Sequence, residues 1–455
     1  MPDAALKTFL AAAGASPTLQ AAGLRPIDQE LPGEPAIGDL RRRRLRPRAE
    51  PGIGYLSLLQ DEDGLLRWDV DSGPATRPLS ARARAGRRGL ISLGLVEQFK
   101  FEMVHGSEVA RFLDGLDTSF NAVRGLRSRG AAGADTGAAQ PIAAAKKNGI
   151  LLIVHGTFSK GDALVEGLNS TADGKKLLAD ASRHYDQVLS FEHPTLSVSP
   201  ILNALDLARA LAGTTAPVDI VCHSRGGLVV RWWLEVLKPP QTKARSVVFV
   251  GSPLQGTSLA SPLRLRTALN LMTNVLVGMQ AAGQLASLAV PLFGVVAGLM
   301  KLISSVTGAA GKTPVIDAAV AMIPGLSAQS RRGLAGQQQI LGSFELDRLA
   351  AGVSQMPGGY FAVKCNFEPT DPAWAFWKHF MRPGERLADL GADLVFPEAN
   401  DLVVDTASMD ALSDLIKVAG PNAVLDLGTS GVVHHLNYFA QPEVAKFIRT
   451  SLAVP

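Results

Sequence analysis

Ser224 is the residue whose surroundings most clearly suggest chemistry. It lies in residues 218–227, which read VDIVCHSRGG, and residues 227–237 have a helix-forming composition. A strand that turns sharply into a helix, with serine at the apex, lifts the hydroxyl clear of a sheet and into reach of a substrate. Gly226 suits the tight turn, whereas Cys222 stands where a second glycine is usual, so the match to G-x-S-x-G is imperfect. The alternative is an ordinary turn or a helix N-cap serine.

A serine hydroxyl becomes a good nucleophile only when a base removes its proton. A carboxylate improves that base by fixing its tautomer and stabilising its positive charge. Hydrolases built on a wound sheet supply these groups in the order serine, acid, histidine. Acidic residues and then histidines follow Ser224 in this order. The sequence therefore offers the components of nucleophilic catalysis by serine.

The scaffold that must bring these residues together is predicted by apolar runs. Continuous runs of the kind buried on both faces of a parallel sheet occur at residues 149–154, 187–191, 218–221, 245–250, 360–367 and 423–427. Helix-forming stretches lie between several of them. This alternation predicts an α/β fold with a wound, mostly parallel sheet covered on both sides.

Residues 148–455 resemble the α/β-hydrolase superfamily, close to bacterial lipases and esterases. Residues 154–157 (VHGT) resemble the strand end that forms the oxyanion hole, and residues 222–226 resemble the nucleophile elbow. Residues 251–257 resemble the Gly-Ser/Thr-Pro segment after the following strand, and residues 400–401 resemble the acid loop. The departures are Cys222 in place of glycine and a long insertion before Asp401.

The resemblance implies a role for each matching residue. Ser224 would be the nucleophile, His435 the general base and acid, and Asp401 the residue that orients the imidazole. The backbone N–H groups of Thr157 and Arg225 would hold the oxyanion, and losing one such donor typically costs about 100- to 1,000-fold in rate. These roles imply a catalytic triad and a carboxylic-ester hydrolase.

Other residues remain candidates for two of these roles. His434 is adjacent to His435 and is the alternative base, although His435 lies nearer to the last helix. Asp393 or Asp405 could replace Asp401, and Asp426 is a weaker candidate inside the last strand. Two other histidines near the expected site, His155 and His223, are interpreted as local packing residues.

Residues 1–145 are predicted to form an N-terminal accessory region that is partly β. Residues 127–141 are rich in Gly and Ala and nearly without bulky apolar side chains, which predicts a linker. We therefore predict a domain boundary there and a hydrolase domain over residues 146–455.

Residues 263–325 are unusually apolar, and no charged residue occurs between Arg266 and Lys301. Within the hydrolase domain, residues 260–340 are predicted to form a helical cap or lid. Three interpretations compete, namely buried cap helices, a lid that contacts lipid, and a membrane-spanning helix. The last is the weakest because Pro291 and several glycines interrupt the run.

Composition excludes several classes of protein. The 455 residues are 47% hydrophobic and 19% charged, which indicates a globular chain of two or three units. Only Cys222 and Cys365 are present, so a disulfide framework is excluded, and no Cys/His spacing resembles a zinc site. No G-x-x-x-x-G-K-[ST] loop occurs. We expect no metal and no cofactor.

The formal charge of +4 arises in the N-terminal third. Residues 1–148 hold 21 Lys and Arg against 17 Asp and Glu, and the rest hold 24 of each. Residues 39–48 form an arginine-rich run without interleaved aromatic residues, so nucleic acid is not an expected partner. A solvated loop is favoured over binding to phosphate or anionic lipid.

No cleavable signal is recognised, because an acid precedes the first base and the apolar run is short. We expect a cytoplasmic protein, with membrane association through residues 263–325 as the alternative. The expected substrate is an ester or lipid-like small molecule, cleaved through a Ser224 acyl-enzyme. The alternatives are an acyltransferase or thioesterase on the same scaffold, or a non-catalytic protein that binds a membrane or partner.

Overall fold

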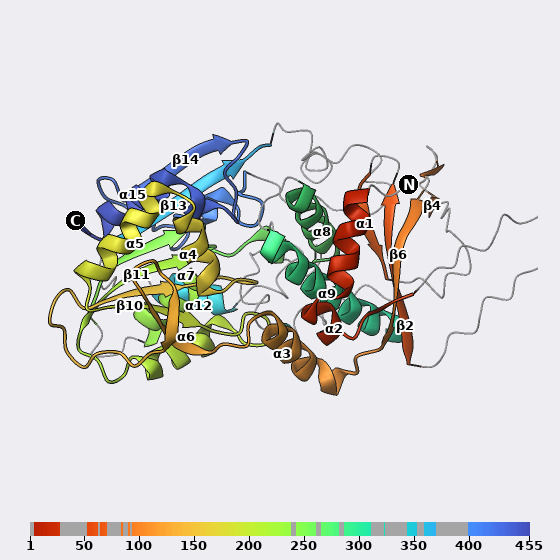
Figure 1. Cartoon of the computed structure of the whole chain (residues 1–455), viewed down its shortest axis with the longest axis horizontal. Helices are drawn as coiled ribbons and strands as arrows, with labels where there is room; N and C mark the ends of the chain where they lie inside the picture. The colour runs from red at the N-terminus through yellow and green to blue at the C-terminus, as the bar shows by residue number, and fades with distance from the viewer. Residues whose placement is uncertain are drawn as a thin grey trace, which may run out of the picture. The chain divides into compact units, whose positions relative to one another are not determined.

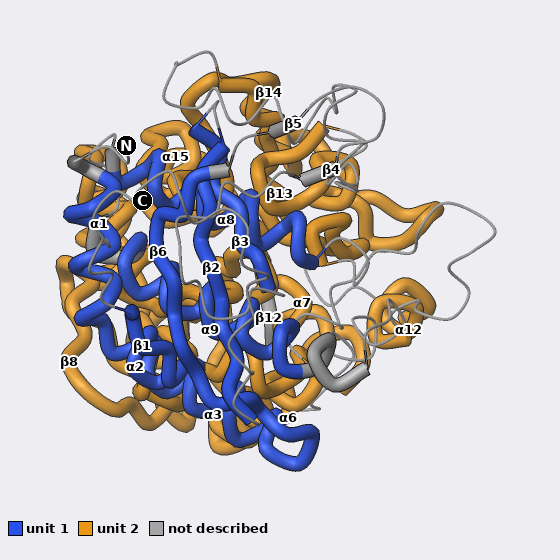
Figure 2. The backbone as a smooth tube through the Cα atoms, turned by 90° about the vertical axis from the view of Figure 1, so that its right-hand side faces the viewer, with its two compact units in different colours: residues 1–120, 263–322, 371–395 blue, residues 121–262, 323–370, 396–455 orange. Residues whose placement is uncertain are grey.

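The computed structural model describes residues 4–27, 52–61, 64–70, 83–84, 90–91, 93–237, 243–260, 265–281, 286–310, 323, 344–352, 359–369 and 399–455. The chain divides into two compact units, which Figure 2 colours separately. Unit 1 comprises residues 1–120, 263–322 and 371–395, and unit 2 comprises residues 121–262, 323–370 and 396–455.

Unit 2 is built on an eight-stranded sheet with the order β14-β13-β12-β11-β9-β10-β7-β8. Figure 1 labels its strands β14, β13, β11 and β10. The strands are β7 (Gly125–Arg129), β8 (Asp135–Ala138), β9 (Ile150–Val154), β10 (Gln187–Glu192), β11 (Pro217–His223), β12 (Lys243–Val250), β13 (Gly359–Phe367) and β14 (Val424–Ser430). The six strands from β9 to β14 run parallel, and only β7 and β8 pair antiparallel. The predicted α/β class with a wound, mostly parallel sheet is confirmed.

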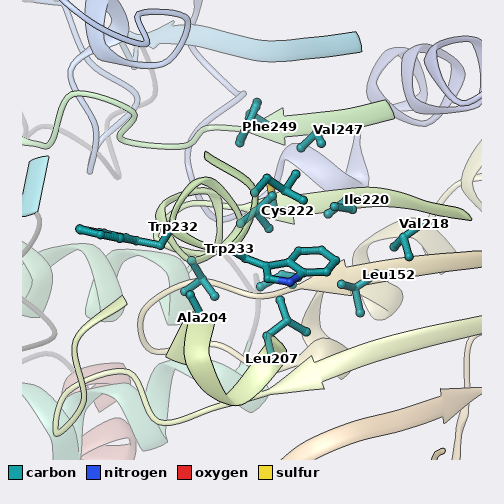
Figure 3. Packing of buried hydrophobic residues seen from close by; sticks show 14 of the residues in the cluster. Leu152, Ala204, Leu207, Val218, Ile220, Cys222, Trp232, Trp233, Val247 and Phe249 are labelled. Carbon is teal, nitrogen blue, oxygen red and sulfur yellow. The ribbon is translucent and has the colours of Figure 1, made fainter. Parts of the chain in front are cut away.

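The helices of unit 2 cover both faces of this sheet. They are α4 (Gly161–Asn169), α5 (Ala172–His184), α6 (Pro200–Ala210), α7 (Gly226–Arg231), a π-helix (Trp232–Leu237), α12 (Phe344–Gly352), α15 (Pro442–Ser451) and short 3-10 turns at Ser258–Ala260, Thr406–Ser408 and Tyr438–Ala440. Side chains alternate along each strand. Leu152 therefore packs with α6 and the π-helix, beside Trp233 in Figure 3, whereas Leu151 packs with α4, α5 and α15.

The order of the parallel strands reverses at β9. The chain runs from β9 outward to β10 and then returns through α6 to place β11 on the other side of β9. In open α/β sheets the crevice outside the carboxyl ends of the strands at such a reversal is where ligands bind. Topology alone therefore directs attention to residues 155–157, after β9, and to Ser224, after β11.

The Gly- and Ala-rich stretch predicted as a linker contains the end of β7 and all of β8. β7 pairs with β10, and β8 pairs with β7 at the sheet edge. Composition misled the prediction because edge strands are stabilised by backbone hydrogen bonds and need few buried apolar side chains. In β7 the buried residues are Leu126 and Arg129.

Unit 1 combines a small antiparallel sheet with helices. Its elements are α1 (Ala4–Gly14), α2 (Pro17–Ala21), β1 (Arg25–Pro26), β2 (Ile53–Asp61), β3 (Leu66–Asp69), β4 (Ala83–Arg84), β5 (Leu90–Ile91), β6 (Leu93–Glu102), a 3-10 turn (Gly106–Glu108), α3 (Val109–Phe120), α8 (Leu265–Ala281) and α9 (Ala286–Ala310). The sheet has the order β1-β6-β2-β3, and β4 pairs with β5. The predicted β-rich character of the first residues agrees with this sheet.

The uncharged apolar segment belongs to unit 1 rather than to the predicted cap of the hydrolase domain. α9 packs against α1, α2, α3, α8 and β2, and the side chains of Phe293, Leu299 and Met300 are fully buried. Asn274 on α8 binds both the N–H and the carbonyl of Leu66 in β3. In the part of the chain that the structure describes, no helix has the length and apolarity to cross a bilayer.

Several predictions fall outside the described residues. These are the arginine-rich run at residues 39–48, residues 370–398 of the insertion before Asp401, which include Asp393, and residues 261–264, 282–285, 311–322 and 324–340 of the predicted cap.

Candidate active site

Ser224 lies on a strained turn between β11 and α7. Its φ of 53° is in the left-handed region, which a residue with a side chain adopts at a cost of about 1–3 kcal/mol. The turn is held by the Ser224 N–H, which donates to Val250 O at 3.0 Å, and by the Gly227 N–H, which donates to Ser224 O at 3.0 Å. A Cβ at Gly226 would lie 2.5 Å from Val154 O, so only glycine fits there. This is the geometry of a nucleophile elbow.

The loop after β9 lies directly against this elbow. A Cβ at Gly156 would lie 2.5 Å from Ser224 Cβ and 3.1 Å from Ser224 Oγ, so glycine permits the close approach. Thr157 follows in the same loop, and the Arg225 N–H lies at the start of α7. The structure thus brings the predicted oxyanion loop and the elbow together.

Asp401 and His435 form a buried hydrogen-bonded pair. His435 Nδ1 lies 2.8 Å from Asp401 Oδ2, and the His435 N–H donates to Asp401 O at 2.9 Å. Asp401 is fully buried and His435 is 3% exposed. Because a carboxylate only accepts, the imidazole proton is on Nδ1, which leaves the lone pair of Nε2 available to act as a base.

A tight turn fixes the Asp401 carboxylate. Its Oδ1 accepts from the N–H groups of Val403 at 3.1 Å and Val404 at 2.8 Å. The intervening Leu402 has a φ of 96°, and Phe158, in the loop after β9, has a φ of 52°. Like Ser224, both residues therefore hold a left-handed backbone conformation. Such strain gathers at functional sites, where the surrounding structure holds it.

The alternative acids and base make other contacts. His434 Nδ1 accepts from the Leu436 N–H at 3.3 Å, and its ring meets Phe367 edge to face. Asp405 Oδ2 accepts from the Ser258 N–H at 2.8 Å. Asp426 is half exposed and lies 3.6 Å from the Lys364 amine.

His223 connects the elbow to the predicted base. Its Nε2 lies 3.0 Å from His435 O, and the two rings are 4.7 Å apart between centroids. Because the carbonyl accepts, the His223 proton is on Nε2. Burial lowers the pKa of His223 well below its usual value, and it likewise lowers the pKa of His155. Both rings are therefore neutral at pH 7, which agrees with a packing role.

A buried ionic cluster anchors the far end of the loop after β9. Glu192 Oε1 and Oε2 each accept from the Gly161 N–H at 3.1 Å, and Oε1 lies 3.0 Å from Arg129 Nη2. Ser190 Oγ donates to Glu192 Oε1 at 2.8 Å. A Cβ at Gly161 would lie 2.3 Å from Glu192 Oε1, so glycine is required there. The cluster fixes the loop that carries Thr157.

Sequence reasoning missed this cluster and also Tyr438, whose hydroxyl lies 2.9 Å from Asp401 Oδ2. A carboxylate immediately after a buried apolar run was a signal for Glu192, and the position three residues after His435 was a weak signal for Tyr438. Arg129 gave no signal, because its stretch has the composition of a linker. Among the described residues, no group of three or more His, Cys, Asp or Glu could hold a metal ion.

The strand order, the helices on both faces and the elbow at the end of β11 define an α/β-hydrolase fold. The chain belongs to the domain family DUF7379, a domain of unknown function, which matches residues 123–453. A search of curated protein sequences gave no match.

Solved structures of known proteins are similar to this chain. The mature lipase BlEst2 of Bacillus licheniformis is 13% identical, with 69% of this chain and 94% of that chain covered and a TM-score of 0.35. Lipase 1 of Pelosinus fermentans is 15% identical, with 67% and 99% covered and a TM-score of 0.37. The haloalkane dehalogenase DatA of Agrobacterium tumefaciens C58 is 13% identical, with 68% and 90% covered and a TM-score of 0.30.

Proposed function

We propose that the protein is a serine hydrolase that cleaves carboxylic esters through a Ser224 acyl-enzyme. The observation that carries the proposal is the buried Asp401–His435 pair, in which the Nδ1–H···Oδ2 contact of 2.8 Å leaves Nε2 unprotonated. The strained elbow at Ser224 and the contact of His223 with His435 O support it, since they join the nucleophile segment to the base segment.

In the proposed mechanism, His435 Nε2 takes the proton of Ser224 Oγ while the oxygen attacks the ester carbonyl. The backbone N–H groups of Thr157 and Arg225 stabilise the oxyanion. Asp401 stabilises the imidazolium, which then protonates the leaving alcohol as the C–O bond breaks. Water, deprotonated by His435, then attacks the acyl-enzyme carbonyl, and His435 returns this proton to Ser224 Oγ as the acyl–oxygen bond breaks and the acid is released. The residues that carry out these steps are the chain's own side chains and backbone.

The test uses p-nitrophenyl esters of increasing acyl length with wild type and Ser224→Ala. We expect hydrolysis by wild type and a loss of about a million-fold in the variant, the size found when a triad nucleophile is removed. A fluorophosphonate probe should label wild type at Ser224 and leave the variant unlabelled. Full activity of the variant would refute the proposal. Absence of both hydrolysis and labelling in wild type would favour a non-catalytic role.

The same experiment bears on two finer predictions. The chain-length series tests for a lipid-like substrate, because a preference for long acyl chains would support contact between residues 263–325 and lipid. Adding a competing alcohol and analysing the products separates ester hydrolysis from acyl transfer.

A further inference from the structure

Tyr438 contacts the same carboxylate oxygen as His435. It lies in the 3-10 turn Tyr438–Ala440, directly after the histidine pair, and it is fully buried. Its hydroxyl lies 2.9 Å from Asp401 Oδ2, and His435 Nδ1 lies 2.8 Å from that atom. Because a carboxylate has no proton to give, the hydroxyl donates to Asp401. Two donors from one chain segment therefore share one acceptor oxygen.

The position of the Tyr438 ring is set by its surroundings. Gly251, with a φ of 52°, follows β12, and a Cβ there would lie 2.6 Å from Tyr438 Cε2 and 3.1 Å from Asp401 Oδ2. Glycine at this position makes room for the ring and the carboxylate together. On the other side, Cys365 Sγ on β13 lies 3.2 Å from the hydroxyl. The ring is held between two neighbouring strands, so its hydroxyl has little freedom to turn away.

We propose that Tyr438 is a positioning residue for the reaction, acting through Asp401. Its hydroxyl holds the carboxylate in the orientation that His435 requires and draws part of the negative charge of Oδ2 away from the imidazole. This inference rests on the proposed function. In a buried site a hydrogen bond to a charged group is strong, equivalent to about one to two pKa units. Part of this hydrogen-bond energy changes the strength of the interaction between Asp401 and His435.

Burial shifts the pKa values of the other titratable groups around the pair in the direction that favours their neutral forms. These groups come from three elements: His223 at the end of β11, Cys365 on β13, and His434 beside the base. Burial lowers the pKa of His223 well below its usual value and lowers that of His434 to about 4. Burial raises the pKa of the Cys365 thiol to about 12. These neighbours are the same in wild type and Tyr438→Phe, so a difference between the two pH profiles reports on the contact of Tyr438 with the Asp401–His435 pair.

The test is the isosteric substitution Tyr438→Phe, followed by kcat/KM for a soluble p-nitrophenyl ester from pH 5 to 9. Without the hydroxyl, the Asp401 charge acts on the imidazole alone and stabilises its protonated form. The acidic midpoint of kcat/KM should therefore move to higher pH by about half a unit to one unit, a fraction of the full hydrogen-bond effect. Activity at pH 6 falls more than activity on the plateau.

The matched control is Tyr360→Phe. Tyr360 is also buried, and its hydroxyl contacts a buried carboxylate, Glu235, at 3.1 Å, away from the triad. We expect the control to keep the wild-type acidic midpoint. An unchanged midpoint in Tyr438→Phe, or an equal shift in the control, would overturn the inference.

A proton NMR measurement without substrate separates this inference from the proposed function. The His435 Nδ1–H resonance should move downfield in Tyr438→Phe, because its hydrogen bond to Asp401 becomes stronger. A resonance that does not move overturns the role of Tyr438 even if Ser224 is labelled by the fluorophosphonate. A shifted resonance in a protein that neither hydrolyses esters nor reacts with the probe leaves the contact correct and the function wrong.

Discussion

The substitution Glu192→Gln tests whether the ionic cluster behind the candidate oxyanion loop holds that loop in place. Glu192 accepts hydrogen bonds from Arg129, Ser190 and the Gly161 N–H, and its side chain is 3% exposed. Glutamine keeps the shape, but it removes the charge and turns an N–H₂ group toward donors. The variant therefore leaves the Arg129 guanidinium, 1% exposed, without its buried partner.

The magnitude follows from this burial. Removing one partner of a buried ion pair costs about 3–5 kcal/mol. Arg129 keeps a second partner in Asp162, which is 42% exposed, so we expect the lower end, about 3 kcal/mol. In a domain of 150–250 residues this lowers Tm by about 6–12 °C. A loop displaced by about 1 Å costs about 100-fold in rate, so kcat should fall by up to about that factor.

The effect on stability has a defined pH dependence. Burial alone would raise the pKa of Glu192, but the nearby His155 ring, when protonated at low pH, together with the Gly161 N–H, the Ser190 hydroxyl and the Arg129 guanidinium, outweighs it, and the pKa lies below the usual 4.5. The charged carboxylate therefore stabilises the fold fully above pH 4.5, and this stabilisation is lost as the pH falls through the lowered pKa. The difference between wild type and Glu192→Gln should shrink in the same range.

Thermal unfolding and steady-state kinetics provide the measurements, with Asp162→Asn as the matched control. That substitution removes the other carboxylate beside Arg129. The Asp162 carboxylate is 42% exposed, so its ion pair with Arg129 should contribute about 1 kcal/mol or less to the free energy of unfolding. If both variants unfold within about 2 °C of each other and keep wild-type kcat, the buried cluster does not position the loop.

Two further substitutions test other parts of unit 2. Asp401→Asn presents an amide to His435 Nδ1 and favours the wrong tautomer of the imidazole, so kcat should fall by about 10,000-fold. The control Asp426→Asn, on exposed β14, should keep the wild-type kcat. Equal kcat values for the two variants would contradict the assignment of Asp401 as the acid. Glu235→Gln leaves Arg231 buried without its charge partner and should cost about 3–5 kcal/mol in urea unfolding, both side chains being fully buried. The double variant Arg231→Met/Glu235→Leu should not recover that loss, because the Arg231 guanidinium also donates to the carbonyls of Leu254, Leu349 and Leu412, which would then be buried and unpaired. A Glu235→Gln variant as stable as wild type would show the pair to be dispensable.

The central strands were predictable because each is a buried apolar run. The predicted strands at 149–154 and 187–191 correspond to β9 and β10 within one residue at either end. Such runs arise because the strands of a parallel sheet are buried on both faces and therefore need apolar residues at every position. β7 has no such apolar run, because it is stabilised by pairing with β10 and by the ion pair of Arg129 with Glu192, which is 63 positions away.

The candidate site was predictable where its residues follow strand ends. The Asp401–His435 contact agrees with the predicted order of acid and base, and their catalytic roles stay a prediction. Tyr438 was missed because a tyrosine in a turn looks like a packing residue until the carboxylate is placed beside it. The apolar segment at 263–325 was predicted to form a cap because composition does not show which elements a segment packs against. In the structure α9 packs against α1, α2 and β2.

The wide separation of the site's components along the chain has a consequence for synthesis. His223, beside Ser224, contacts His435 across 212 positions, and β13 joins the sheet only after two segments of unit 1 have been made, β14 only after all three. Domains generally fold during translation from the N-terminal side. A ribosome-bound intermediate therefore holds Ser224 before His435 has been made, so under the proposed function hydrolytic capacity arises only after the segment with His435 has emerged.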